Sequence, residues 1–260
     1  MYKTIIYSEN AKIASINLNR PEKKNAMNDV MINELIDVFE QLELNDDIRV
    51  ITITGEGDTF CSGADLNWLS EVKDFSYKQN YNESLKLVKL LKLIHEHYKP
   101  VICKVNGPAV GGGVGLMLAS DIVIASEDSF FGLSEVAIGI IPAAIIPFLM
   151  SRMSEAKARE YLITGNRLNA KEAEFNNLIN YSVQRHEIDE FTNQIVNKIK
   201  NNGMIAVSKV KEMVNTFSAT KLNDSNMEYI ANIIAKLRTS EEGQEGISAF
   251  LEKRKPNWIE

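Results

Sequence analysis

The feature that most constrains the fold is a glycine-rich segment in the middle of the chain, residues 106–115. The preceding residues 101–105 have the composition of a buried strand, and residues 111–119 have that of an apolar helix. At such a turn, free backbone amides lie at the positive end of the helix dipole and can bind an oxyanion. Close packing of the strand against the helix is the alternative reason for the glycines. The Walker lysine and the dinucleotide-binding glycine spacing are both missing.

Strands and amphipathic helices alternate through the first half of the chain, which predicts an α/β architecture built from repeated units. The predicted elements are strands 4–7 and 13–18 with a turn at residues 8–10, helix 28–45, strand 50–54, a helical region with interruptions over residues 66–97, strand 101–105, a turn at residues 106–110, helix 111–119 and strand 122–125. Later segments are mostly helical, with helices expected at 155–164, 189–200, 206–217 and 227–237. We divide the chain into a core, residues 1–195, and a C-terminal helical region, residues 196–260, that would pack either against other subunits or back on its own domain.

Composition excludes several classes of protein. The chain has 260 residues and a net charge of -6, so it lacks the overall basic field that attracts nucleic acid or anionic lipid. Its two cysteines, Cys61 and Cys103, lie far apart and lack metal-type spacing, which indicates reduced thiols. No signal peptide or membrane-spanning segment is visible, and we expect a cytoplasmic protein.

A second turn of small residues, Ser62 to Asp65, also follows a strand and leads into a helix. Two such turns could each supply one amide, and a pair of convergent amides stabilises an enolate or another oxyanion. Glu135 is the candidate acid/base, because the apolar run that follows it, residues 138–142, could desolvate the carboxylate and raise its pKa.

The chain resembles the enoyl-CoA hydratase/isomerase, or crotonase, family along nearly its whole length. The resemblance rests on the order and spacing of these motifs: Asn19-Arg20-Pro21 with Asn25-Ala26-Met27, Ser62-Gly63-Ala64-Asp65, Gly107 through Gly113, Asp121-Ile122, Phe131-Gly132 with Glu135, Gly139 with Ile141-Pro142, and Phe250 with Lys253. It implies the crotonase spiral of ββα units with a C-terminal helical trimerisation region. It also implies an acyl-CoA thioester substrate without a further cofactor, and a homotrimer or a dimer of trimers.

The resemblance assigns roles to individual positions. Ala64 and Gly112 match the residues whose amides form the family's oxyanion hole, and Glu135 matches one of its two catalytic glutamates. The residues implied in binding the coenzyme A part of the substrate are Lys23, Lys24, Ala26, Ser62, Asp65, Leu66 and Gly111, with Phe250 and Lys253 from a C-terminal segment that often belongs to a neighbouring subunit. The two lysines of residues 23–24 would supply the local positive charge that the acidic chain otherwise lacks.

The chain departs from the two-glutamate hydratases at Gly115, where the family's other catalytic glutamate would stand. Ala143 also replaces a glycine that is frequent in those enzymes. One carboxylate can still shift a double bond, which is isomerisation, or activate water and return its proton, which is hydration. A closer resemblance to bacterial methylglutaconyl-CoA hydratases of leucine and terpenoid breakdown, which also have glycine here, ranks hydratase above isomerase. A non-catalytic acyl-CoA-binding or RNA-binding relative is the alternative from another class.

Other polar and aromatic residues carry weaker signals. His95 and His97 would point to different faces of a helix, so we expect no metal site. Trp68 could line an acyl pocket or belong to the core. The pocket walls are expected within residues 68–98, a stretch without motifs, so the acyl group cannot be read from the sequence.

Overall fold

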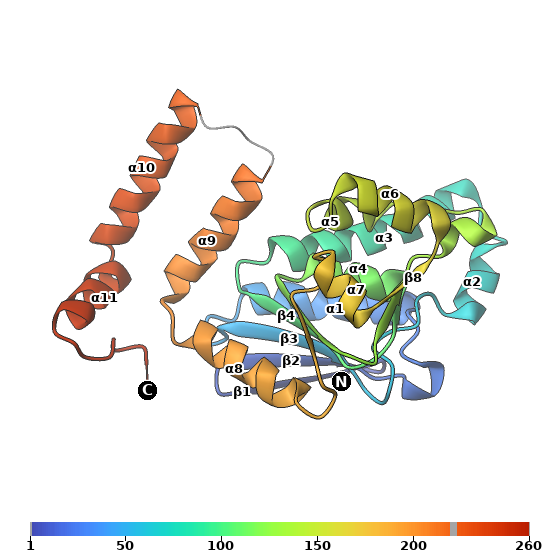
Figure 1. Cartoon of the computed structure of the whole chain (residues 1–260), viewed down its shortest axis with the longest axis horizontal. Coiled ribbons are helices and arrows are strands. Elements are labelled where there is room, and N and C mark those ends of the chain that lie inside the picture. The colour runs from blue at the N-terminus through green and yellow to red at the C-terminus, as the bar shows by residue number, and fades with distance from the viewer. Residues whose placement is uncertain (1, 219–222, 260) are drawn as a thin grey trace.

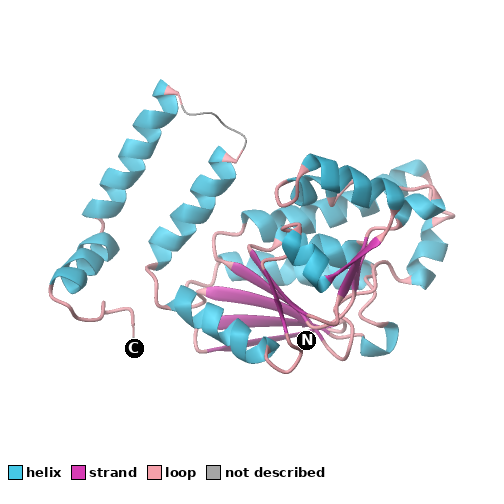
Figure 2. Ribbon diagram, viewed as in Figure 1, coloured by secondary structure: helices cyan, strands magenta, loops and turns pink. Residues whose placement is uncertain are grey.

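The computed structural model describes residues 2–218 and 223–259, which form two sheets covered by helices (Figures 1 and 2). The larger sheet has the strand order β1 (Ile5–Asn10), β2 (Ile13–Leu18), β3 (Val50–Gly55), β4 (Val101–Val105), β6 (Ile122–Ser126) and β9 (Tyr181–Val183). The smaller sheet consists of β5 (Ala109–Val110), β7 (Phe130–Gly132) and β8 (Arg167–Asn169). Pairing is parallel except between β1 and β2 and between β7 and β8.

The helices, in chain order, are η1 (Pro21–Lys23), α1 (Asp29–Glu43), α2 (Leu66–Val72), α3 (Tyr77–Glu96), α4 (Gly112–Ala119), η2 (Glu135–Ile138), α5 (Ile146–Met150), α6 (Glu155–Thr164), α7 (Ala170–Phe175), α8 (Ile188–Lys200), α9 (Met204–Phe217), α10 (Asp224–Thr239) and α11 (Glu241–Leu251). Within the described residues, none is long and apolar enough to cross a membrane.

The central strands of the larger sheet are buried on both faces, whereas the edge strand β1 is largely exposed. Side chains of α1, α3 and α4 form the main core with Ile51, whereas Val50, the next residue of the same strand, packs with Ile188 and Val196 of α8 on the opposite face. Successive side chains of a strand point to opposite faces, so a strand inside such a sheet is apolar at every position. This explains the mostly apolar sequence of the central strands, in which Thr52, Thr54 and Lys104 are half-buried exceptions, and the fold confirms the α/β prediction.

The predicted hairpin turn was misplaced. Strand β1 continues through Asn10, and the hairpin turn is made by Ala11 and Lys12, whose φ angles are 48° and 68°. Glycine, asparagine and aspartate are the usual residues in this conformation, so their absence hid the turn. The interrupted helical region predicted over residues 66–97 is present as two helices, and the second begins at a capping box formed by Ser76 and Gln79.

The predicted helix over residues 28–45 and the four helices of the C-terminal third are present, with ends that differ by a few residues. The short strands β5, β7, β8 and β9 and the helices α5, α7 and α11 were not predicted. The predicted domain boundary after residue 195 falls inside α8, and the division into two regions stays a prediction.

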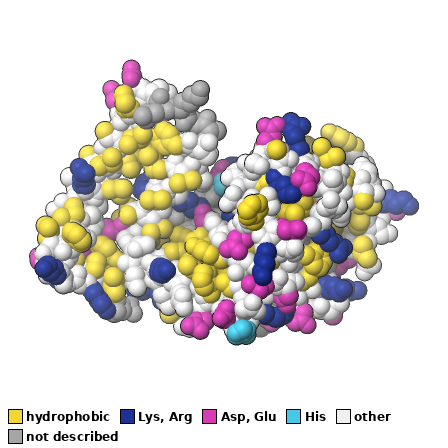
Figure 3. All heavy atoms as spheres, viewed as in Figure 1, with side chains coloured by type: hydrophobic (Ala, Val, Ile, Leu, Met, Phe, Trp, Pro, Cys, Tyr) yellow, Lys and Arg dark blue, Asp and Glu magenta, His cyan; other side chains and the backbone are white. Residues whose placement is uncertain are grey.

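Residues 203–259, which we call the C-terminal arm, extend away from the body (Figure 1). Glu242 of α11 accepts hydrogen bonds from the amides of Ile205 and Ala206, both at 3.0 Å, and so caps α9. Apolar side chains such as Val210 and Val214 remain more than 60% exposed along α9. Hydrophobic side chains are spread over the visible face of the arm (Figure 3).

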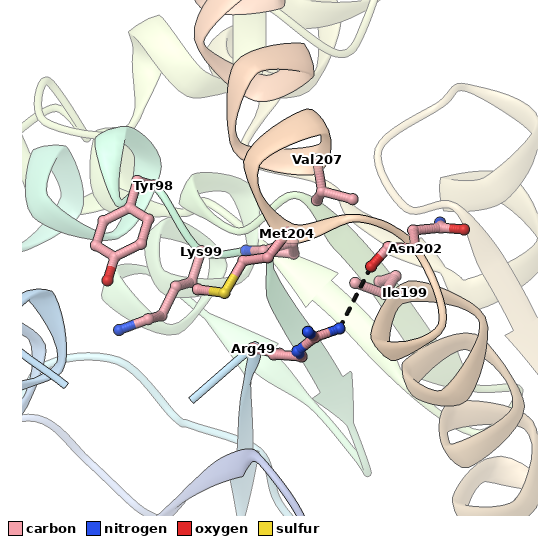
Figure 4. A pocket seen from close by; sticks show the side chains of 8 residues that line it. Arg49, Tyr98, Lys99, Ile199, Asn202, Met204 and Val207 are labelled. Atoms are coloured by element: carbon pink, nitrogen blue, oxygen red, sulfur yellow. Dashed lines mark hydrogen bonds between the residues drawn. The ribbon is translucent and has the colours of Figure 1, made fainter. Parts of the chain in front are cut away.

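Polar contacts hold the arm and the segment just before it against the body. Arg49 donates to the carbonyl oxygens of Lys200 at 2.9 Å and Asn202 at 3.4 Å, beside Met204 of α9 (Figure 4). Further along α9, the ammonium group of Lys211 lies 2.7 Å from the carboxylate of Asp121.

The Asp121 carboxylate also accepts a hydrogen bond from the Val101 amide at 2.7 Å. We therefore expect Asp121→Ala to lower the free energy of unfolding by about 3–5 kcal/mol, because it leaves the Lys211 ammonium buried without its counter-ion. Urea denaturation measures this loss. Glu96→Ala, which breaks the exposed pair with Lys92, is the matched control and should cost less than about 1 kcal/mol. Equal losses in the two variants would show that the buried pair does not hold the arm.

Candidate active site

Two turns far apart in the sequence lie in direct contact. The amide of Cys61 donates to the carbonyl of Pro108 at 3.2 Å, and the amide of Val110 donates to the carbonyl of Cys61 at 2.9 Å. Just beyond this pairing, a β-carbon on Gly111 would lie 3.7 Å from Cα of Gly63. The two turns that the sequence indicated are therefore packed together, and glycines at their contact let the backbones approach closely.

The two amides predicted to bind an oxyanion, those of Ala64 and Gly112, donate to no acceptor within the described residues. Next to Ala64, the amide of Met27 donates to the carbonyl of Gly63, and the amide of Asp65 donates to the carbonyl of Met27, both at 2.7 Å. Neither hydrogen bond uses the Ala64 amide. Gly112 is the first residue of α4, where amides have no partner inside the helix. Ala64 is exposed and Gly112 half-buried, so both amides can meet a ligand.

Glu135 begins the short helix η2, which follows β7. One carboxylate oxygen, Oε1, lies 3.3 Å from the point where a β-carbon on Gly111 would stand. The other, Oε2, is buried and has no hydrogen-bond partner among the described residues. Burial raises the pKa of Glu135 above its ordinary value. The structure places this carboxylate beside the glycine turn, and such a group is suited to proton transfer. The apolar run 138–142, which was expected to desolvate it, is largely exposed at Ile138, Ile140 and Ile141, so other parts of the fold bury the carboxylate.

The position of the missing second glutamate is filled with hydrocarbon. A β-carbon on Gly115 would stand 3.1 Å from Cγ1 of Ile145 and 3.2 Å from Cδ1 of Leu91. Both side chains belong to the main core. A carboxylate at residue 115 would have to displace them and would be buried in an apolar environment, which is costly for a charge.

The loop that contains Lys23 and Lys24, predicted to lie against a nucleotide, packs on the turn of residues 62–65. The amide of Ser62 donates to the carbonyl of Lys24 at 3.0 Å, and its hydroxyl lies 3.5 Å from the carbonyl of Lys23. Both lysine side chains are exposed, whereas Ala26 is buried. The structure therefore places two cations beside the turn and leaves their side chains accessible.

Asp65 and Leu66 follow the oxyanion turn and differ in exposure. The buried Asp65 carboxylate accepts from the Asn67 amide at 2.8 Å, capping α2, and pairs with Arg20 at 2.6 Å, whereas Leu66 is 80% exposed. The hydrogen bond from Arg20 is the largest cause of the lowered pKa of Asp65. Arg20 also donates to the carbonyl of Ala26 at 2.5 Å. It thus ties the loop to the turn, a role that sequence reasoning did not assign although it quoted the Asn19-Arg20-Pro21 motif.

Phe250 and Lys253 are not brought to the site within one chain. Phe250 lies on α11 of the arm, at the opposite side of Figure 1 from α2, and its side chain is 82% exposed. Lys253 follows two residues after the end of this helix.

The remaining candidate groups do not form a second site. No group of three or more metal-binding side chains occurs in the part of the chain that the structure describes. Burial raises the pKa of Cys61 to about 11, so its thiol is not a nucleophile. Trp68 packs against the main core while remaining partly exposed. The small pocket of Figure 4, at the base of the arm, contains none of the predicted site residues.

Gly111 offers a test of this geometry. Its φ of 51° with ψ of -121° strongly favours glycine, and a side chain there would press on Glu135 and Gly63. We expect Gly111→Ala to lower the turnover rate about 100-fold, as misplacement of catalytic groups by about 1 Å does. Gly132→Ala, whose β-carbon would meet its nearest neighbour at 3.6 Å, is the control and should retain activity. Unchanged turnover in Gly111→Ala would mean that the turn does not position the reacting groups.

Comparisons with known proteins agree with this geometry. Residues 8–260 match the family model described as enoyl-CoA hydratase/isomerase. A Thermus thermophilus relative, provisionally named an enoyl-CoA hydratase, is 32% identical over 98% of this chain and 100% of its own. The crotonyl-CoA hydratase of Syntrophomonas wolfei is 31% identical over 99% and 98%. The crystal structure of an enoyl-CoA hydratase from Shewanella pealeana superposes with a TM-score of 0.95, at 33% identity and with 98% and 96% covered. The fold is that of the crotonases, and the chain belongs to the enoyl-CoA hydratase/isomerase family.

Proposed function

We propose that this enzyme is a hydratase that adds water to a short or branched 2-enoyl-CoA, with Glu135 as its only catalytic carboxylate. The observation that carries the proposal is the contact between Gly63 and Gly111, the neighbours of the unused amides of Ala64 and Gly112, with Oε1 of the desolvated Glu135 carboxylate beside Gly111. The amides fit a thioester oxygen that becomes negatively charged, and the carboxylate fits the transfer of a proton.

The proposed reaction needs two proton transfers and no further cofactor. The ionised carboxylate of Glu135 accepts a proton from water while the water oxygen bonds to C3 of the enoyl group. The electron pair of the double bond moves onto the thioester oxygen, which the amides of Ala64 and Gly112 stabilise as an enolate. Glu135 then gives its proton to C2, and the carbonyl re-forms. Removing one such amide donor typically costs about 3–4 kcal/mol of barrier, and acid/base catalysis supplies about 100- to 10,000-fold.

The isomerase alternative uses the same groups. Glu135 would remove a proton from C2 of a 3-enoyl-CoA and return it at C4, through a dienolate held by the same amides. The apolar side chains around Gly115 favour the isomerase, because they leave no room for the second carboxylate that two-glutamate hydratases use. The non-catalytic alternative is less well supported, because the free amides and the desolvated Glu135 are both retained.

The acyl group that we propose is short or branched. Apolar side chains follow Glu135 and remain largely exposed, among them Ile138 and Ile141 at 65% each, and they can contact hydrocarbon. The name of the Syntrophomonas wolfei relative specifies a short acyl group, crotonyl. 3-Methylglutaconyl-CoA is the branched candidate, which the resemblance noted above suggests.

We further propose that neighbouring copies of the chain complete the coenzyme A site. Within one chain, Phe250 and Lys253 lie on the arm, away from Lys23, Lys24 and the oxyanion turns. The exposed apolar residues of α9 could be covered by a second copy, consistent with a trimer or a dimer of trimers.

The test follows crotonyl-CoA, 3-methylglutaconyl-CoA and a 3-enoyl-CoA by mass spectrometry with the wild-type enzyme and Glu135→Gln. We expect the 2-enoyl substrates to gain the mass of one water. We expect Glu135→Gln to lower this rate at least about 100-fold, because the amide cannot accept the proton. A shifted double bond without a mass gain would identify an isomerase. Binding without turnover of any substrate would contradict both enzymatic proposals.

The pH dependence follows from the sign of the Glu135 shift. Because burial raises the pKa of Glu135, the ionised base is lost on acidification at a higher pH than for an ordinary glutamate. We expect kcat/KM for hydration to fall on the acid side through a pKa above the usual value of about 4.3. A pH series of initial rates measures it, and a profile that is flat down to the ordinary pKa would contradict the assignment.

A further inference from the structure

Helix α6 packs one face against the loop that carries Glu135. Ala158 and Tyr161, three residues apart on that helix, are each 1% exposed. One turn later the helix ends at Gly165, where a β-carbon would lie 3.4 Å from Cγ2 of Val136 and 3.5 Å from Cα of Ser134. The face of α6 that contains Tyr161 therefore meets the residues on either side of Glu135.

Two polar atoms in this contact are buried and lack a hydrogen-bond partner among the described residues. They are the hydroxyl of Tyr161 and Oε2 of Glu135. Leaving either group unpaired costs roughly 1–3 kcal/mol, so buried polar atoms are normally satisfied by protein or by ordered water. A tyrosine hydroxyl can donate and a carboxylate can only accept, which makes the two groups complementary.

The negative charge of Glu135 acts electrostatically on the Tyr161 hydroxyl. Burial is the largest cause of the raised pKa of the Tyr161 hydroxyl, and the negative charge of Glu135 adds to it. The hydroxyl therefore keeps its proton and stays a donor. Among the described residues, charged side chains on the surrounding elements are engaged elsewhere: Lys157 with Glu160, Arg159 with Glu155, Arg167 over the ring of Phe130, and Arg152 with the carbonyls of Ser120 and Asp121.

We propose that Tyr161 is the positioning residue of the catalytic carboxylate: its hydroxyl donates, through one bound water molecule, to Oε2 of Glu135. The proposal rests on the proposed role of Glu135 as acid/base. No direct hydrogen bond joins the two atoms, and a water that bridges two polar groups is nearly as favourable as a direct bond. Oε2 is thereby fixed towards α6, while Oε1, beside Gly111, remains free to move the substrate's protons.

This arrangement gives the one-carboxylate site what a second glutamate would otherwise help to provide, a fixed orientation and a tuned pKa. A donor to the carboxylate stabilises its charged form and lowers its pKa, which opposes the effect of burial. Tyr161 and the desolvating surroundings of Glu135 would thus act in opposite directions on the same titration.

The test compares the acid limb of the kcat/KM profile in Tyr161→Phe with that of the wild type. Because phenylalanine removes only the donor, we expect the limb to move to higher pH by roughly half to one unit. We expect kcat to fall about 10-fold while KM for the thioester changes little. Losses of about this size are typical when a hydrogen-bond partner that orients a functional side chain is removed. Tyr2→Phe, which removes a hydroxyl bonded to Asp37 on the surface, is the matched control and should leave the limb in place.

A second variant replaces Tyr161 with 3-fluorotyrosine, which strengthens the donor without changing its shape. We expect it to move the acid limb to lower pH, opposite to Tyr161→Phe, and it decides the question should the phenylalanine variant fail to fold. A limb that stays in place in both variants, or a loss of rate without a shift, would overturn the proposal. If Glu135→Gln keeps the acid limb of the wild type, the acid/base assignment itself fails, whatever Tyr161 does.

Discussion

The site depends on the backbone pairing between Cys61 and Ala109, which locks two distant turns together. The pairing also ties the turns to the smaller sheet. Ala109 begins β5, and the amide of Gly111 donates to the carbonyl of Gly132, at the end of β7, at 2.8 Å. A glycine is needed on each side of the contact, and a β-carbon on Gly113 would lie 2.7 Å from Cβ of Cys61. The amides of the two turns are therefore oriented by the folded core and need no reorganisation when charge develops on a bound oxygen.

The same core limits the chemistry. Leu91 and Ile145 pack where a side chain at residue 115 would lie, so the helix that presents one oxyanion amide cannot also present a carboxylate without repacking. In the proposed mechanism all proton transfer then falls to Glu135, which lies at the start of η2 and owes its raised pKa to burial. A single carboxylate that both accepts and returns a proton must keep its orientation. The packing of α6 against the loop that carries Glu135 therefore matters for the proposed mechanism.

The sequence predicted much of this arrangement, for identifiable reasons. Mostly apolar runs such as residues 50–54 and 101–105, interrupted by Thr52, Thr54 and Lys104, mark central strands whatever lies around them. The two turns and Glu135 were found because small residues and a lone carboxylate in an apolar run are visible along the chain. Three features remained hidden. The Ala11-Lys12 turn has no typical turn residue, and two-residue strands such as β5 have no periodicity. The burial of the Tyr161 hydroxyl depends on how α6 packs, which the sequence does not show.

The central claim is that one thioester oxygen meets both turns while Glu135 faces the reacting carbons. A crystal structure of the enzyme with acetoacetyl-CoA, whose enolate resembles the proposed intermediate, tests this most directly. The account predicts the thioester oxygen about 2.7–3.1 Å from the amide nitrogens of both Ala64 and Gly112, with Oε1 of Glu135 directed at C2 and C3. A thioester oxygen bound elsewhere, or a Glu135 carboxylate turned away from these carbons, would contradict it.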